Sequence, residues 1–167
     1  MSMMLNTDCQ GCRNEKGFTL LEGMLASAIL TVGLLALSGM QGIALVKNVD
    51  ANELTRITTL AADMMERIQF NRRNAVAYNG IDTQSVTNCS GISAGTQPMA
   101  SGDCLLWDSI VDGTQFENVR GLVTVSAVKA PTSLNQRDVT VTITWVGSSN
   151  SAKRSRTLTL QRVVAPE

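Results

Sequence analysis

The stretch Arg13–Leu30, RNEKGFTLLEGMLASAIL, joins a charged segment to a long apolar one. The charged segment ends at Gly17, and the apolar run that follows carries a carboxylate, Glu22, near its start. No residue from Gly23 to Val46 is charged. As a helix, residues 18–46 would extend about 43 Å at 1.5 Å per residue, which exceeds the roughly 30 Å of a bilayer core. The run therefore predicts a transmembrane helix.

Two other interpretations of the run are a buried helix of a soluble protein and a secretory signal peptide. A single domain of 167 residues could hardly cover such a helix on all sides. A signal peptide is cut after its apolar region, whereas the small residue that resembles a cleavage point, Gly17, precedes it. Cleavage there would remove residues 1–17 and leave the helix in place, with a free amine on Phe18.

The carboxylate of Glu22 needs a physical explanation, because a lone charge at membrane depth is costly and usually has a partner or a role. The new α-amine of Phe18 would lie one helical turn away, in the same chain or in a neighbouring one. Between two chains, the pair would fix the register, because any other offset strands a buried charge. The alternative is a glutamate that simply lies among the lipid headgroups.

The residues KGFTLLE, Lys16–Glu22, resemble the processing signature of type IV pilins and type II secretion pseudopilins. The family pattern is a leader that ends in Gly, then an aromatic residue, Thr, two aliphatic residues and Glu. The resemblance implies that Gly17 precedes the cut made by the prepilin peptidase and that Phe18 becomes the N-methylated first residue. It also implies that Glu22 guides docking of the subunit into the growing fibre.

The following stretch, Ala28 to Gln41, is similar to the pilus-modification (V-type) minor pilins, with the I-type pseudopilins of type II secretion as close cousins. The resemblance implies a minor pilin that acts in pilus initiation and assembly at the tip. Its implied partners are other minor pilins, the major pilin, the prepilin peptidase and methylase, the inner-membrane assembly platform and a large adhesin-like tip protein. The implied location is the inner membrane, with a periplasmic C-terminal domain, and then the pilus at the cell surface.

Beyond the membrane segment (18–46), residues 47–167 are expected to form one globular domain, beginning with an amphipathic helix over 47–77. Its apolar side chains recur at three- and four-residue spacing, and the charged ones, Glu53 among them, fall largely off that stripe. The stripe consists of Leu54, Ile57, Ala61, Met64 and Ile68.

Residues 78–120 have the Gly-, Ser-, Thr- and Asn-rich composition of loops, and a disulfide between Cys89 and Cys104 is expected there if this half of the chain lies in an oxidising compartment. One short helix is predicted, capped by Ser101 or Asp103. Its expected apolar face consists of Leu105, Leu106, Ile110 and Val111.

Residues 121–167 favour β-strands, because Val, Thr and Ile alternate in three segments, 121–130, 138–147 and 153–164. The short connections predict antiparallel hairpins, with Trp145 in the core. The expected fold is therefore α+β and pilin-like, with one long N-terminal helix packed on an antiparallel sheet of three or four strands.

Composition excludes several functions. Lys and Arg together number 14, as do Asp and Glu, so the positive field typical of nucleic-acid binding is absent. Without histidine, His-based triads and the commonest metal ligand are missing. Cys9 and Cys12 supply only two of the four ligands of a structural zinc site. The sequence predicts no catalytic residues, cofactor or metal. A membrane-anchored sensor or adhesin, binding through the disulfide-bounded loop, is the alternative function.

Overall fold

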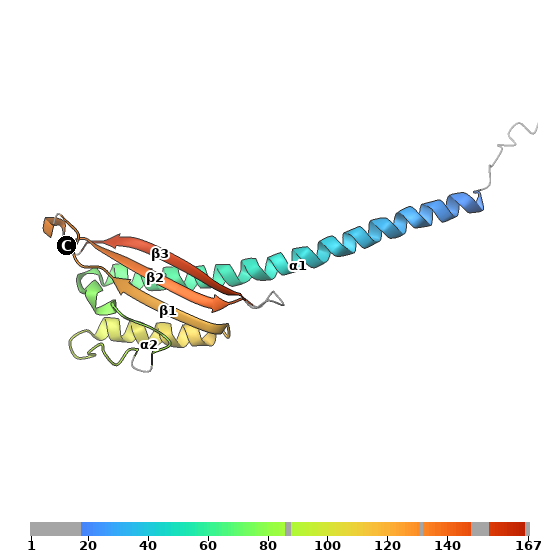
Figure 1. Ribbon diagram of the computed structural model, residues 1–167. Coiled ribbons are helices and arrows are strands. Elements are labelled where there is room, and N and C mark those ends of the chain that lie inside the picture. The colour runs from blue at the N-terminus through green and yellow to red at the C-terminus, as the bar shows by residue number, and fades with distance from the viewer. Residues whose placement is uncertain (1–17, 86–87, 131, 148–153, 166–167) are drawn as a thin grey trace, which may run out of the picture. The chain divides into compact units, whose positions relative to one another are not determined.

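The computed structural model describes residues 18–85, 88–130, 132–147 and 154–165. The elements along the chain are the helix α1 (Leu20–Phe70), the 3-10 turn η1 (Arg72–Tyr78), the helix α2 (Pro98–Gly113), the strand β1 (Glu117–Val125), the 3-10 turn η2 (Thr132–Leu134), and the strands β2 (Arg137–Val146) and β3 (Ser155–Val164) (Figure 1). The chain divides into two compact units, one up to Ile43 and one from Ala44 onward. Each unit is described by itself.

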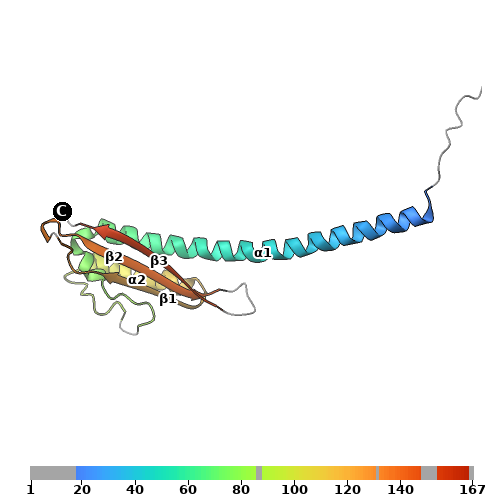
Figure 2. The same cartoon turned by 45° about the horizontal axis from the view of Figure 1, so that its top comes forward.

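The second unit contains a three-stranded antiparallel sheet in the order β1-β2-β3, with the C-terminal half of α1 and with α2 packed beside it (Figures 1 and 2). In the central strand, burial alternates along the chain, as expected for a sheet with one face on the core. Val139, Val141, Ile143 and Trp145 are buried, and the threonines between them lie on the outer face. The predicted α+β architecture and the meander are confirmed.

The core of the second unit is centred on Trp107, which the sequence analysis did not select. Its indole is fully buried and its Nε1 donates a hydrogen bond to the carbonyl oxygen of Leu60, 3.2 Å away. The ring also lies directly over the backbone of Gly121 in β1. One tryptophan of α2 therefore joins α1 and the sheet in a single core. Trp145 is also buried, as predicted.

The apolar stripe of α1 was predicted correctly at four of its five positions. Ile57, Ala61, Met64 and Ile68 are fully buried, whereas Leu54 is 47% exposed. Position 53 continues the buried row instead, because 53, 57 and 61 are spaced by four residues on one face. Glu53 is accordingly only 4% exposed, contrary to its expected place off the stripe, and its Oε2 lies 3.8 Å from Nη1 of Arg156 in β3.

The prediction for α2 was wrong about its start and about much of its face. The helix begins at Pro98, so Ser101 and Asp103 lie inside it and cap nothing. Pro is well suited to this first position, since its missing N–H is not needed there. The buried residues are Ala100, Ser101, Cys104, Trp107 and Val111, while the predicted Leu105 and Leu106 are 60% and 44% exposed.

Two element boundaries also differ from those expected. The first helix ends at Phe70 instead of continuing to residue 77, and the 3-10 turn η1 follows it, with non-helical dihedrals at Asn74. The first strand covers Glu117–Val125 instead of 121–130. Beyond Val125 the ladder becomes irregular: the N–H of Ser126 still donates to the carbonyl oxygen of Asp138 at 2.8 Å, but the N–H of Asp138 donates to the hydroxyl of Ser126 at 2.8 Å.

Candidate functional site

The start of α1 carries the residues that the sequence singled out. Gly17 lies outside the described residues, as do Cys9 and Cys12. Phe18 is 75% exposed and precedes the helix, which begins at Leu20. Glu22 lies in the first helical turn and is exposed.

Thr19 caps this helix, a role that the sequence analysis missed. Its carbonyl oxygen accepts the N–H of Gly23 at 3.2 Å, and its hydroxyl accepts the N–H of Glu22 at 3.3 Å. Thr19 is therefore the N-cap, and Glu22 occupies the third helical position, where a capping box places Glu or Gln. The signal in the sequence is T-x-x-E. A carboxylate there also interacts favourably with the positive end of the helix dipole.

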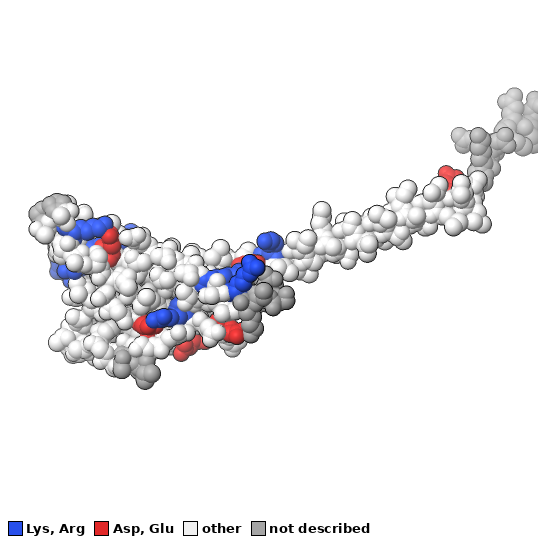
Figure 3. Space-filling model, viewed as in Figure 1, with Lys and Arg blue, Asp and Glu red and all other residues white. Residues whose placement is uncertain are grey.

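The helix after Glu22 exposes apolar side chains on all sides. From Leu20 to Val46 the large apolar side chains are between 42% and 82% exposed, and this part of the helix is almost entirely white in Figure 3, where charged residues are coloured. By length and composition, α1 is long and apolar enough to cross a membrane. A helix that is apolar all round requires a lipid or protein environment.

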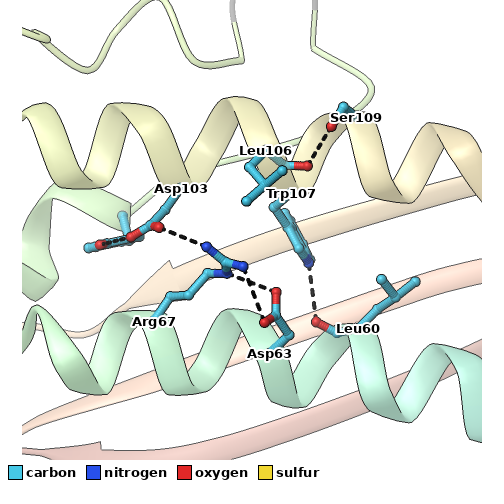
Figure 4. A network of polar contacts seen from close by, with 8 residues as sticks. Leu60, Asp63, Arg67, Asp103, Leu106, Trp107 and Ser109 are labelled. Atoms are coloured by element: carbon cyan, nitrogen blue, oxygen red, sulfur yellow. Dashed lines mark hydrogen bonds and ion pairs between the residues drawn. The ribbon is translucent and has the colours of Figure 1, made fainter.

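The second unit contains a polar network where α1, η1 and α2 meet (Figure 4). The guanidinium of Arg67 donates to Asp63 at 2.8 Å and to Asp103 at 3.1 Å. The hydroxyl of Tyr78 donates to the other oxygen of Asp103 at 2.6 Å, and Asn71 donates to that hydroxyl at 3.1 Å. Burial, and then the hydrogen bond to Asp103, raise the pKa of Tyr78 above its usual value.

These groups join the end of α1 to η1 and α2. The pKa of Arg67 is raised, chiefly by its hydrogen bond to Asp63, so the guanidinium remains a charged bridge between helices. Among the described residues, no three His, Cys, Asp or Glu side chains gather as a metal site requires. The network is accordingly structural.

The loop before α2 is held by a disulfide and by an asparagine. Cys89 and Cys104 are joined, as expected. The side-chain amide of Asn88 accepts the N–H of Asp82 at 2.8 Å and donates to the carboxylate of Asp108 at 2.9 Å. Burial raises the pKa of Asp108. At the edge of the sheet, the pKa of Asp82 is lowered, above all by its hydrogen bond from Arg120.

The comparisons with known proteins point to the start of α1. The prokaryotic N-terminal methylation motif matches residues 12–38. No curated protein and no solved structure matches the chain significantly. The matched segment covers the expected cleavage point, the capped helix start and most of the apolar run. This motif is the signal of type IV pilins and pseudopilins, and together with the α+β fold it supports a type IV pilin-like protein.

Proposed function

We propose that this chain is a minor pilin, a structural subunit that acts in type IV pilus initiation and assembly at the tip. The observation that carries the proposal is the methylation motif over residues 12–38, which covers the start of α1 and most of its charge-free, exposed apolar segment. The similarity of residues 28–41 to the V-type minor pilins supports the finer assignment. In this proposal residues 1–17 are a removable leader, 18–46 the membrane and assembly helix, and 47–167 the periplasmic domain.

In this role the chain is itself the substrate of the processing enzymes. Cleavage after Gly17 creates the α-amine of Phe18, and N-methylation leaves that amine cationic. Assembly is driven by packing of apolar helices, and Glu22 pairs with the amine of a neighbouring subunit. Any other register would leave a buried charge without a partner, which costs much more than the pair itself contributes. The partners are the processing enzyme, the assembly platform and the other pilins.

Processing is tested by expressing the full chain with and without a prepilin peptidase and measuring the intact mass of the membrane-extracted product. The expected product lacks Met1–Gly17 and carries one methyl group where the methylase is active. A Gly17→Val variant should stay uncut. An uncut wild-type chain, beside a control pilin that the same peptidase processes, would contradict the proposal.

Docking is tested with two substitutions of Glu22, which distinguish the effect of its charge from the effect of its side chain on the start of the helix. Glu22→Gln keeps a side chain that suits the third helical position but removes the charge, and Glu22→Leu removes both. We expect both variants to be cleaved normally and to be lost from sheared fibres to a similar degree. Glu66→Leu, which removes an exposed carboxylate elsewhere on α1, is the matched control. Normal incorporation of Glu22→Gln would assign the residue to helix capping alone.

A pilus role is distinguished from an I-type pseudopilin role by the phenotype of a deletion in the host cell. Loss of surface fibres with normal export of secreted enzymes is expected. The reverse result would assign the chain to a type II secretion system, while leaving its processing and docking as proposed.

A further inference from the structure

A cavity of about 550 Å³ lies in the second unit, between the residues around the end of η1 and the loop that follows Cys89. This volume falls within the range of about 300–1,000 Å³ typical of small-ligand sites. Its lining includes apolar residues, among them Val76, which is 52% exposed, and Ile92, which packs against the core. The loop on one side of it is tied to α2 by the Cys89–Cys104 disulfide.

The lining of this cavity is polar but uncharged. Three side-chain amides, Asn79, Asn88 and Gln97, and two hydroxyls, Ser93 and Thr96, line it, and among the described residues no Asp, Glu, Lys or Arg does. The other four pockets described in the protein each include at least one charged residue. An ionic ligand would find no opposite charge here to compensate for its loss of hydration.

One of these polar groups, the side-chain amide of Asn79, is fixed at one end and available at the other. The carbonyl oxygen of the Asn79 side chain accepts the N–H of Val125 at 2.8 Å, which leaves its amino group without a hydrogen-bond partner among the described residues. Gln97 is the N-cap of α2, yet its side chain makes no capping hydrogen bond. Asn88 is held at both ends, by Asp82 and Asp108. Asn79 and Asn88 are therefore positioned before any ligand arrives, which reduces the entropy lost on binding.

We propose that this cavity binds a neutral, polyhydroxylated ligand of the size of a pyranose unit. Sugar hydroxyls both donate and accept hydrogen bonds, and side-chain amides offer both functions within one group. The apolar side chains of Val76 and Ile92, which also line the cavity, suit the C–H groups of such a ring. This function goes beyond the proposed role in fibre assembly and does not depend on cleavage at Gly17.

The structure offers a variant that fills the cavity and another that does not. A Cβ at Gly91, which lines the cavity, would meet no atom within 4 Å, and the backbone there is not left-handed. Gly91→Leu should therefore add bulk to the lining of the cavity without strain. Gly102, in α2 and outside the cavity, also has open space around its Cα, so Gly102→Leu is the matched control. Gln97→Leu removes one polar group and no hydrogen bond of the fold.

The test is saturation-transfer difference NMR on the full chain in a detergent that contains no sugar headgroup. The probes are glucose, galactose, mannose and N-acetylglucosamine, with N-acetylneuraminic acid and glucose 6-phosphate as charged probes. We expect at least one neutral sugar to bind, roughly tenfold or more weakly to Gly91→Leu and about two- to tenfold more weakly to Gln97→Leu. Gly102→Leu should bind as the unaltered chain does.

Three outcomes would overturn the proposal. They are the absence of saturation transfer to every neutral sugar, stronger binding of the charged probes, and binding that Gly91→Leu leaves unchanged. Tryptophan fluorescence of each variant shows that it is folded, because both tryptophans are buried in this unit. None of these outcomes bears on the leader, since processing is measured separately by mass.

Discussion

Gly121 in β1 lets the indole of Trp107 in α2 pack directly on the strand, because it has no Cβ. A Cβ at this position would lie 2.7 and 2.9 Å from Cζ3 and Cζ2 of Trp107, and closer still to Cη2. Real Cβ contacts are never that short, so Gly121→Ala must displace the indole or the strand. We expect it to lower the free energy of unfolding by about 1–3 kcal/mol, the usual cost of overpacking.

The measurement is urea unfolding followed by tryptophan fluorescence, in which both reporters belong to the second unit. Gly102→Ala is the control, because its Cβ meets open space on an exposed helical position. That change should raise stability by roughly 0.5–1 kcal/mol, as Ala is the better helix former. Equal effects of the two substitutions would show that the Trp107 contact relaxes freely.

Tyr78 provides a second prediction at this scale, because it is the only tyrosine in the chain. Its raised pKa means that the folded protein keeps the phenolic proton over a pH range in which the unfolded chain has lost it. The stabilisation is therefore complete below about pH 10, the ordinary value for tyrosine, and is lost as the pH rises above it.

The ultraviolet absorbance of tyrosinate measures this directly. We expect no ionisation of the folded chain near pH 10 and normal ionisation in urea. Asp103→Asn should lower the pKa of Tyr78 toward the usual value, since the carboxylate that accepts the hydrogen bond of the phenol is removed. Tyr78→Phe removes the ionisable hydroxyl. The free energy of unfolding of this variant should therefore fall less above pH 10 than that of the unaltered protein. Ionisation of the folded protein near pH 10 would mean that the hydroxyl is hydrated.

At the scale of the elements, the Cys89–Cys104 disulfide ties the loop before α2 to the helix and is expected to stabilise the domain. The Cys89–Cys104 bridge spans 15 residues, and closing a loop of that size is worth about 3 kcal/mol in the chain-entropy model. We expect Cys89→Ala/Cys104→Ala to lose roughly that much stability in urea unfolding. Reduction of the unaltered protein should have a similar effect, while the doubly substituted protein should not respond to reductant. An unchanged midpoint on reduction would contradict a stabilising bridge.

The contrast between the strands and α2 shows what a single sequence can predict. In β2, strict alternation of Val, Ile and Trp with Thr fixed both the element and its buried face, because side chains of a strand alternate between faces. In α2, apolar side chains lie on more than one face of the helix, and only some of them are buried. Cys104, Trp107 and Val111 are the buried ones, because the disulfide and the hydrogen bond from Trp107 to Leu60 orient the helix. Those constraints are tertiary, so periodicity alone selected Leu105 and Leu106 wrongly.

The start of α1 was predictable in a different way. The order of Gly17, Phe18 and Glu22 before an apolar run is a local pattern, which the motif match to residues 12–38 also detects. The N-cap at Thr19 has a signal in the same stretch, T-x-x-E, but the sequence analysis assigned Glu22 a role in docking alone. The cavity beside Asn79 could not be foreseen, since it is formed by segments that only the fold brings together.

At the scale of the whole molecule, the two units differ in what they need from their surroundings. The unit up to Ile43 exposes its large apolar side chains, and the unit from Ala44 onward has its own buried core. The first fully buried core residue along the chain is Ile57. Of the residues that the structure describes, those before Ala44 therefore contribute no core side chain.

We accordingly expect a chain that begins at Ala44 to be soluble without detergent and to unfold cooperatively, with the same raised pKa of Tyr78 as the full chain. A chain that begins at Leu60 is the matched comparison. It lacks both Ile57 and Glu53, and loss of one large core side chain typically costs about 2–5 kcal/mol, a large fraction of the stability of a small domain. Circular dichroism and urea unfolding of the two fragments provide the test. If the Ala44 fragment is unfolded while the full chain is folded, the apolar helix must contribute to the stability of the globular unit as well as to its anchoring.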